Sequence, residues 1–129
     1  MSKALMSKAM VVDDSRAVRM LLAYTLRELG FEVSEAGNGR EALEALDKIH
    51  DPVDLVMTDW NMPEMNGLEL LKELRRHPRL HSVPIVMVTT ETEIDQMAAA
   101  LEAGANEYIM KPFTREIIID KLRMAGIKV

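Results

Sequence analysis

The chain has 129 residues, the length of a single domain, and its 48% apolar and 29% charged residues are typical of a folded globule with an aliphatic core. A balance of 16 Lys and Arg against 21 Asp and Glu gives a net charge of -5, which opposes binding to a nucleic-acid backbone. Cysteine is absent, which excludes disulfides and thiolate zinc sites, and no apolar run approaches the roughly 20 residues that span a bilayer, so we expect a cytoplasmic protein that does not bind membranes.

The chain begins with a near-repeat, in which residues 2–6 resemble residues 7–10. We interpret residues 1–8 as a flexible or duplicated start to one domain that spans residues 1–129. We assign no function to this repeat.

Five apolar runs then alternate with five stretches of helical periodicity. The predicted strands cover residues 9–12, 31–36, 53–58, 85–88 and 107–110. Ser15 and Thr114 are expected to cap the first and last helices, and Gly30 and Gly104 to end the first and fourth. The predicted inward faces comprise Val18, Leu21, Leu22, Thr25 and Leu29 in the first helix and Ile94, Met97, Ala98 and Leu101 in the fourth.

The short connections between these units predict a doubly wound α/β fold, in which helices cover both faces of a five-stranded parallel sheet. Ligands in such sheets bind beyond the carboxyl ends of the strands. The polar residues at these ends are Asp13, Asp14, Asp59, Thr89 and Lys111. We therefore expect these residues, although far apart in the sequence, to converge on one edge of the sheet.

Three of these residues, Asp13, Asp14 and Asp59, are carboxylates that repel one another, so their grouping predicts a bound divalent cation. A few oxygen ligands with room for water suit Mg²⁺, or Mn²⁺, better than Ca²⁺. Lys111 adds further positive charge. The site with its cation is then nearly neutral and can receive a phosphoryl group.

Asp59 is the candidate nucleophile, because a carboxylate can attack phosphorus to form an acyl phosphate. Thr89 is placed to donate a hydrogen bond to a phosphoryl oxygen once that oxygen has arrived. If Thr89 is drawn inward, Tyr108 on the neighbouring strand can rotate into the vacated space, which predicts a switch. The competing interpretations are helix capping for Asp13 and Asp14, strand propensity alone for Thr89, and edge-strand packing for Tyr108.

Four segments together carry a recognisable pattern. They are Val11-Val12-Asp13-Asp14-Ser15, Asp59-Trp60-Asn61-Met62-Pro63 with Gly67, Val88-Thr89, and Tyr108-Ile109-Met110-Lys111-Pro112-Phe113. This pattern resembles the motifs of the CheY-like response-regulator receiver family, and the resemblance extends over essentially the whole chain. It implies a flavodoxin-like strand order of 2-1-3-4-5.

The resemblance also implies roles for individual residues. Asp14, Asp59 and the backbone carbonyl of Asn61 are expected to contact the metal directly, and Asp13 to contact it through water. Asn61 and Glu91 match a chemotaxis regulator of the family at positions expected to influence hydrolysis of the acyl phosphate. Their presence favours a short-lived signal.

The resemblance further implies a cis peptide between Lys111 and Pro112. The chain departs from the family pattern at two positions. Asn66 stands where the family often has Asp, a change that we expect to be nearly silent because this side chain is not a metal ligand. Thr90 stands where the chemotaxis regulator has Ala, and its bulk beside the phosphoryl pocket is expected to slow the entry of water or of a phosphatase. The lifetime of the signal therefore stays open.

The implied function is that of a single-domain response regulator, phosphorylated by a histidine kinase, that catalyses no chemistry beyond its own phosphorylation and dephosphorylation. Its output is expected to be binding to another protein, such as a flagellar motor switch component or another chemotaxis protein. We expect a monomer, and dimerisation on phosphorylation stays open. One alternative is a phosphorelay shuttle between histidine-containing proteins. The other is a haloacid-dehalogenase-like phosphatase, which would need a second Asp where this chain has Asn61.

Three successive isoleucines, Ile117, Ile118 and Ile119, cannot all face the core, because successive helical residues turn by about 100°. We therefore expect at least one of them to be exposed, and we hypothesise that it belongs to a partner-binding face with Tyr108 and with Ala98 of the preceding helix.

A short basic cluster, Arg75, Arg76 and Arg79, stands out in this acidic chain. We interpret it as a solvated helix end.

Overall fold

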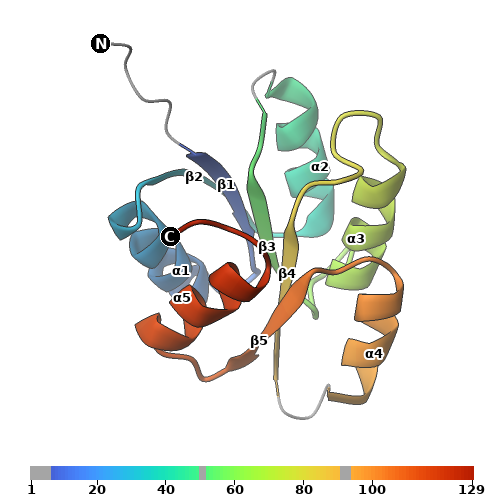
Figure 1. Ribbon diagram of the computed structural model, residues 1–129. Helices are drawn as coiled ribbons and strands as arrows, with labels where there is room; N and C mark the ends of the chain where they lie inside the picture. The colour runs from blue at the N-terminus through green and yellow to red at the C-terminus, as the bar shows by residue number, and fades with distance from the viewer. Residues whose placement is uncertain (1–6, 50–51, 91–93) are drawn as a thin grey trace.

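The computed structural model describes residues 7–49, 52–90 and 94–129, in which strands and helices alternate (Figure 1). The strands are β1 (Ser7–Val12), β2 (Phe31–Ala36), β3 (Leu55–Asp59), β4 (Ile85–Thr90) and β5 (Glu107–Lys111). The helices are α1 (Arg16–Glu28), α2 (Gly39–Lys48), α3 (Gly67–Arg76), α4 (Ile94–Glu102) and α5 (Arg115–Met124).

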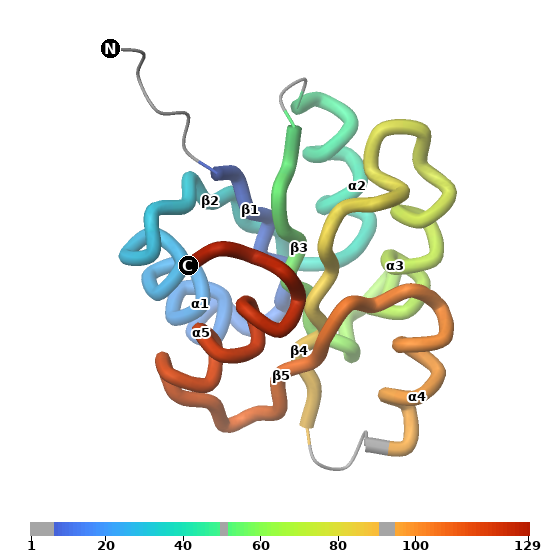
Figure 2. The backbone as a smooth tube through the Cα atoms, in the orientation of Figure 1, coloured from blue at the N-terminus to red at the C-terminus, as the bar shows by residue number. Residues whose placement is uncertain are grey.

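The strand pairs of the described residues are all parallel, and the strand order is β2-β1-β3-β4-β5. The predicted doubly wound α/β fold and its strand order are therefore confirmed. Helices α1 and α5 cover one face of the sheet, and α2, α3 and α4 cover the other, as the tube in Figure 2 also shows. Burial on both faces explains why the central strands are apolar runs, whereas β2 at the edge mixes buried and exposed residues.

The start of the fold differs from the prediction. Ser7 and Lys8, expected in a flexible or duplicated start, belong to β1, because they pair with Phe31 and Glu32 of β2. The rest of the near-repeat, residues 1–6, lies outside the described residues.

The sheet separates two apolar clusters. Successive residues of β1 enter opposite clusters, with Met10 and Val12 on the side of α2, α3 and α4, and Ala9 and Val11 on the side of α1 and α5. This alternation follows from the two-residue period of a strand. It fixes the register of β1 and therefore the point at which the strand ends.

The inward face of α1 differs from the prediction at one position. Leu22 and Thr25 are buried as predicted, but Leu21 is 52% exposed and Leu26 lies in the core instead. Leu21 and Leu22 are successive residues about 100° apart on the helix, so the sheet can bury only one of them fully.

The inward face of α4 is also shifted by one residue. Met97 is buried as predicted, whereas Ala98 and Leu101 are exposed and Ala100 is buried. The predicted pair, Ala98 and Leu101, and the observed pair, Met97 and Ala100, each have a spacing of three residues. Because the helix is rich in alanine, its two sides differ too little in apolarity to show which pair is buried. The side chain of Ile94 lies outside the described residues.

The helix ends follow the predicted signals. The side chains of Ser15 and Thr114 accept hydrogen bonds from the backbone three residues later, at 3.3 and 3.2 Å. Gly30 and Gly104 have φ values of 99° and 114°, in the left-handed region that glycine adopts most easily. Among the described residues, no helix has the length and apolarity needed to cross a membrane.

Candidate functional site

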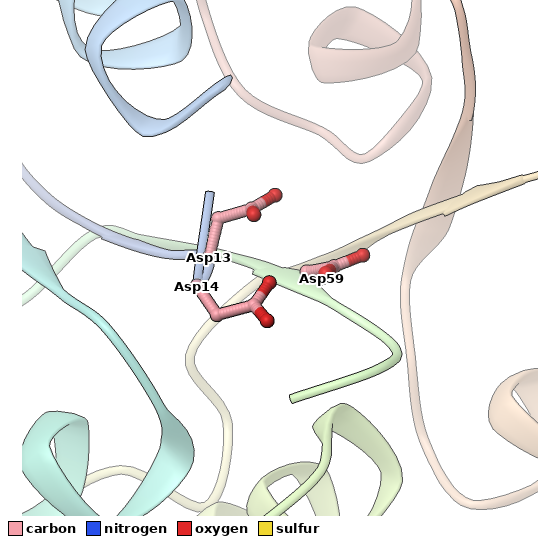
Figure 3. A group of neighbouring side chains, drawn as sticks. All are labelled: Asp13, Asp14 and Asp59. Carbon is pink, nitrogen blue, oxygen red and sulfur yellow. The ribbon is translucent and has the colours of Figure 1, made fainter. Parts of the chain in front are cut away.

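Three carboxylates lie together at the carboxyl edge of the sheet. Asp59 is the last residue of β3, and Asp13 and Asp14 directly follow β1. Strands β1 and β3 are adjacent and parallel, with Val12 paired to Thr58, so the residues that follow this pair lie side by side. Figure 3 shows the three side chains turned toward the same side, and one oxygen of each lies within 4.8 Å of the others. We call these three residues the acidic trio.

The acidic trio is buried on one side and open on the other. Asp13 is fully buried and Asp59 is 6% exposed, whereas Asp14 is at the surface. The Oδ1 atom of Asp13 accepts a hydrogen bond from the backbone N–H of Ser15 at 2.8 Å, but its Oδ2 atom accepts none. The ammonium of Lys111 lies 3.3 Å from this Oδ2 atom, but a buried carboxylate oxygen that accepts no hydrogen bond is still incompletely satisfied and can take a further partner.

Lys111, the last residue of β5, reaches across the end of β4 to the acidic trio. Its Nζ atom lies 3.1 Å from Oδ1 of Asp59 and 3.3 Å from Oδ2 of Asp13. Burial alone would lower the pKa of Lys111, but the charges of the two carboxylates outweigh burial and raise the pKa above its ordinary value. The ammonium therefore stays charged at neutral pH. The peptide between Lys111 and Pro112 is cis, as predicted.

The environment of Asp59 opposes its ionised form. Burial raises the pKa of this carboxyl and the nearby Asp13 raises it further, whereas Lys111 and the backbone N–H of Trp60 lower it. The net effect is a rise of the pKa from 3.8 to about 6. A cation beside the acidic trio would favour the ionised carboxylate and reverse this rise.

The donor set of the acidic trio fits a hard divalent cation. Its three members offer only carboxylate oxygens, which are the ligands that Mg²⁺ and Mn²⁺ take in proteins. Lys111 offsets one of the three negative charges and leaves the others for a cation. The Oδ2 atom of Asp13 has an ion pair with Lys111 but accepts no hydrogen bond, so it can also contact the cation or a water molecule bound to it.

The β3–α3 loop (residues 60–66) forms the wall of the site beside Asp59. Asn61 lies exposed in this loop, two residues after Asp59. The loop closes through a hydrogen bond of 2.8 Å from the N–H of Gly67 to the carbonyl of Trp60. A Cβ atom on Gly67 would collide with the backbone carbonyl oxygen of Asp59. Only glycine therefore lets α3 begin so close to the end of β3.

Thr89 and Thr90 end β4 at the same edge of the sheet. Val88 pairs with Asp59, and Thr90 pairs with Lys111. Thr89 is 1% exposed, and its hydroxyl donates a hydrogen bond to the carbonyl of Thr90 at 3.3 Å. The structure thus places both threonines between the strand ends that carry the carboxylate and the lysine.

Tyr108 is half-buried in β5 and packs against the apolar cluster on the side of α2, α3 and α4. It pairs with Met87, so its ring shares a sheet face with Thr89, two residues further along β4. The ammonium of Lys121 lies 4.0 Å from the centre of the ring and 3.3 Å from Oε1 of Glu107. This cation–π contact, which the sequence did not predict, stabilises the observed position of the ring.

The hypothesised partner face is only partly at the surface. Ala98 is exposed, Ile117 is 39% exposed and Ile119 is half-buried. Including Ile118 was wrong, because this residue is 1% exposed and lies in the core with Leu122, four residues later on the same side of α5.

Arg19 makes a contact with the site that the sequence did not predict. Its Nη1 atom donates a hydrogen bond of 2.7 Å to the carbonyl of Asp13, and its Nε atom lies 3.2 Å from Oε1 of Glu35 on β2. The only sequence signal for this contact was a basic residue near the start of the first helix. Such a residue forms no recognised motif. The contact ties the turn that carries Asp13 and Asp14 to the edge strand.

Known proteins are similar to this chain in sequence and in fold. The family described as the response regulator receiver domain matches residues 9–123. The "Chemotaxis protein CheY1" of Helicobacter pylori is 48% identical over 118 residues, which cover 91% of this chain and 94% of the relative. The "Chemotaxis protein CheY homolog" of Campylobacter jejuni is 48% identical over 116 residues, which cover 89% and 88%.

A solved structure agrees with these matches. The chemotaxis protein CheY4 of Vibrio cholerae superimposes with a TM-score of 0.86 at 36% identity, covering 94% of this chain and 99% of that chain. The family match includes the acidic trio, Thr89 and Lys111. The chain therefore belongs to the response regulator receiver domain family.

Proposed function

We propose that this chain is a phosphorylation-switched response regulator that accepts a phosphoryl group on Asp59 from a phosphohistidine of a kinase. The observation that carries the proposal is the position of Asp59, whose Oδ1 atom accepts two N–H bonds in a pocket shared with two further carboxylates and a lysine. Phosphorylation of an aspartate with Mg²⁺ is general in the family to which the chain belongs.

The geometry supports a direct transfer to Asp59. Its Oδ1 atom accepts the bonds from Trp60 and Lys111, so Oδ2 attacks phosphorus. The new O–P bond forms as the P–N bond of the donor breaks, and the electron pair of that bond leaves with the imidazole, which takes a proton from solvent. Lys111 offsets the negative charge that arrives with the phosphoryl group.

Asp13, Asp14 and Asp59, with the backbone carbonyl of Asn61, would hold Mg²⁺ or Mn²⁺ in this site. When bound, such a cation offsets charge on the phosphoryl oxygens. The residues themselves orient the acceptor, since Lys111 contacts both buried carboxylates.

Thr89 and Tyr108 would convert phosphorylation into a conformational change. The hydroxyl of Thr89 makes a long bond of 3.3 Å to the carbonyl of Thr90, which a charged phosphoryl oxygen can replace with a stronger one. Movement of Thr89 toward the phosphoryl group opens space on the sheet face that it shares with the ring of Tyr108. The ring then leaves the ammonium of Lys121, which transmits the change to α5.

The relatives that carry the name chemotaxis protein suggest the pathway. We propose a cytoplasmic role in chemotaxis, with a histidine kinase as donor and with output to a protein such as a flagellar motor switch component. The exposed Ala98 and Ile117, together with Tyr108 and Ile119, would contribute to the binding face. Thr90 beside the pocket would slow hydrolysis of the acyl phosphate.

The test is intact mass spectrometry after incubation with Mg²⁺ and acetyl phosphate, with rapid quenching. The wild type is expected to gain one phosphoryl group, and Asp59→Asn or an excess of chelator is expected to abolish the gain, because both the acceptor and the cation are required.

Asp120→Asn on the exposed side of α5 is the matched control and should be labelled like the wild type. A phosphoryl adduct that persists in Asp59→Asn would refute the assignment of the acceptor. An unlabelled wild type, even with a phosphorylated histidine kinase as donor, would refute the proposed function.

A further inference from the structure

The connection from β2 to α2 consists of Gly37 and Asn38 together with Gly39, the first residue of α2, and we call it the β2–α2 turn. It touches the β3–α3 loop, although it contributes no residue to the acidic trio. The backbone N–H of Gly39 donates a hydrogen bond of 3.2 Å to the carbonyl of Met65. The side-chain amide of Asn38 donates a bond of 3.4 Å to Oε2 of Glu64. Asn38 is 5% exposed, so its amide is held away from bulk water. Asn38 and Gly39 of the β2–α2 turn therefore bind Glu64 and Met65 of the β3–α3 loop.

The contact at Gly39 is too close for any other residue. A Cβ atom on Gly39 would lie 2.8 Å from Cγ of Met65, 2.9 Å from its carbonyl oxygen and 3.0 Å from its Cβ. The side chain of Met65 packs against the apolar cluster between the sheet and α2 and α3. One of the colliding atoms is the backbone carbonyl oxygen of Met65, so rotating the side chain of Met65 alone does not relieve the collision. The absence of a side chain at position 39 is therefore a requirement of the contact with the loop.

The β3–α3 loop has bonds of its own at both ends of residues 60–66. Gly67 bonds to the carbonyl of Trp60, and Met65 donates a bond of 2.7 Å to the carbonyl of Pro63. Glu64 adopts a φ of 64°, a left-handed conformation that is unfavourable for a non-glycine residue. The bond from the β2–α2 turn ends on this same Glu64. The contacts from the β2–α2 turn therefore add to the loop's own bond at Met65 and hold the segment in which Glu64 is strained.

We propose that Asn38 and Gly39 are positioning residues, which hold the β3–α3 loop so that its backbone at Asn61 can meet the cation bound by the acidic trio. This inference rests on the proposed function, because it concerns the same cation. Mg²⁺ demands near-ideal octahedral geometry, so a loop that samples several positions loses affinity even when every carboxylate is present. The β2–α2 turn thereby becomes a determinant of metal affinity without touching the metal.

The variants must separate this role from the other role of Asn38. Its Oδ1 atom also caps α2 by accepting a bond of 2.9 Å from the N–H of Glu41, and its amide donates a bond of 3.3 Å to Oε2 of Glu41. Asn38→Ser keeps a capping oxygen but has no amide to reach Glu64. Gly39→Ala introduces the collision with Met65. Gly37→Ala is the matched control, because a Cβ atom there would have its nearest contact at 3.6 Å.

The first readout is a Mg²⁺ titration followed by the fluorescence of Trp60, the single tryptophan, which adjoins Asp59 and is buried. Gly39→Ala is expected to raise the Kd for Mg²⁺ about tenfold and Asn38→Ser about threefold, whereas Gly37→Ala leaves it unchanged. The melting temperature in chelator reports damage to the fold separately. A Kd within twofold of the wild type in both Gly39→Ala and Asn38→Ser would overturn the proposal. If Gly39→Ala does not fold, Asn38→Ser decides alone by the same criterion.

The second readout is amide hydrogen exchange of residues 60–66 in chelator, which requires no cation. Both variants are expected to exchange several-fold faster than the wild type over this loop, with unchanged exchange in β4. Unchanged exchange over the loop would overturn the proposal. If the wild type binds no Mg²⁺ but the loop exchange still rises in the variants, the proposed function fails and the positioning role of the β2–α2 turn survives.

Discussion

At Asp59, the ionised form that phosphoryl transfer needs is also the form that the cation-free fold disfavours. The pKa of this carboxyl is about 6 in the folded protein, against an ordinary value of 3.8. Between these two pH values the unfolded chain has released the proton while the folded protein retains it. The contribution of Asp59 to stability therefore falls as the pH rises from about 4 to about 6, because at this site the native state binds more protons than the unfolded state.

Asp59→Asn is expected to stabilise the cation-free protein, because the amide cannot ionise. One pKa unit corresponds to about 1.4 kcal/mol, and solvent at the pocket mouth screens part of the shift, so we expect a gain of about 1–2 kcal/mol at pH 7 and almost none at pH 4. Urea unfolding in chelator, followed by circular dichroism at both pH values, measures the difference. Asp120→Asn should change neither value, and a destabilised Asp59→Asn at pH 7 would contradict the assigned pKa.

The sequence was sufficient to group Asp13, Asp14, Asp59 and Lys111, because a parallel sheet brings the carboxyl ends of its strands to one edge. It was not sufficient for the contact of Arg19 with the carbonyl of Asp13, which depends on how α1 lies beside β2. Contacts made by long, flexible side chains to backbone carbonyls leave no periodic trace in a sequence.

Asn66 shows how a residue near the site can have a purely local role. Its side chain accepts a bond of 2.9 Å from the N–H of Glu69, and the carboxylate of Glu69 accepts one of 3.0 Å from the N–H of Asn66. This capping box starts α3. Asn and Asp cap helices about equally well, which gives a physical reason for the expectation that Asn in place of Asp is nearly silent.

Among the helices, the end of α3 departs most from its predicted environment. Arg75 is not solvated, as the sequence suggested, but donates hydrogen bonds to the carbonyls of His81, Val83 and Gly104 and to Oδ1 of Asn106. Its burial lowers the pKa of its guanidinium from the ordinary value. One side chain thus joins α3 to the segment before β4 and to the α4–β5 connection.

Arg75→Lys is expected to lower the free energy of unfolding by about 1–3 kcal/mol, because an ammonium cannot reproduce the forked contacts and leaves carbonyls unsatisfied. Chemical denaturation in chelator measures the loss. Arg76→Lys is the matched control, since Arg76 is exposed and has a surface pair with Glu73 that contributes little. Equal effects of the two substitutions would show that the contacts of Arg75 do not stabilise the fold.

The spacing of apolar residues predicts the buried face of some helices better than that of others. In α3, Leu70, Leu71 and Leu74 are all buried as their spacing suggests. In α4, runs of alanine blur the boundary between the apolar and polar sides, and the predicted face was one residue out of phase at Ala98 and Leu101. The phase of such a helix is set by the sheet against which it packs.

For the whole molecule, cation binding and folding are linked. A ligand that binds only the folded state stabilises it by about 2.7 kcal/mol at 100 times its Kd, which for a chain of this size corresponds to a rise in melting temperature on the order of 10 °C. We expect Mg²⁺ to produce such a rise at pH 7. At pH 5 the rise should be smaller, because protons compete for Asp59.

Differential scanning calorimetry with Mg²⁺ or with chelator measures this rise. Asp13→Asn, which removes one charge from the acidic trio, should reduce it. An equal melting temperature with and without Mg²⁺ in the wild type would contradict the assignment of the acidic trio as a metal site.

At the same scale, the layered architecture was predictable but the strand order was not. Five strand–helix units of regular length predict a parallel sheet with helices on both faces. The succession of units alone is compatible with several orders, and the observed β2-β1-β3-β4-β5 order was anticipated only through the resemblance to receivers. The sequence of β2 is consistent with its position at the edge of the sheet, because this strand mixes polar and apolar residues.

Phosphoryl transfer needs ionised Asp59, whereas the cation-free fold is more stable with a neutral side chain at this position. These opposite demands affect how the protein can evolve or be engineered. A library screened only for resistance to heat, without a cation, would be enriched in neutral side chains at position 59 and would lose the phosphoryl acceptor early. Selection for signalling must act continuously against that trend. A thermostable form that still switches must therefore acquire its stabilising substitutions away from the carboxyl edge of the sheet.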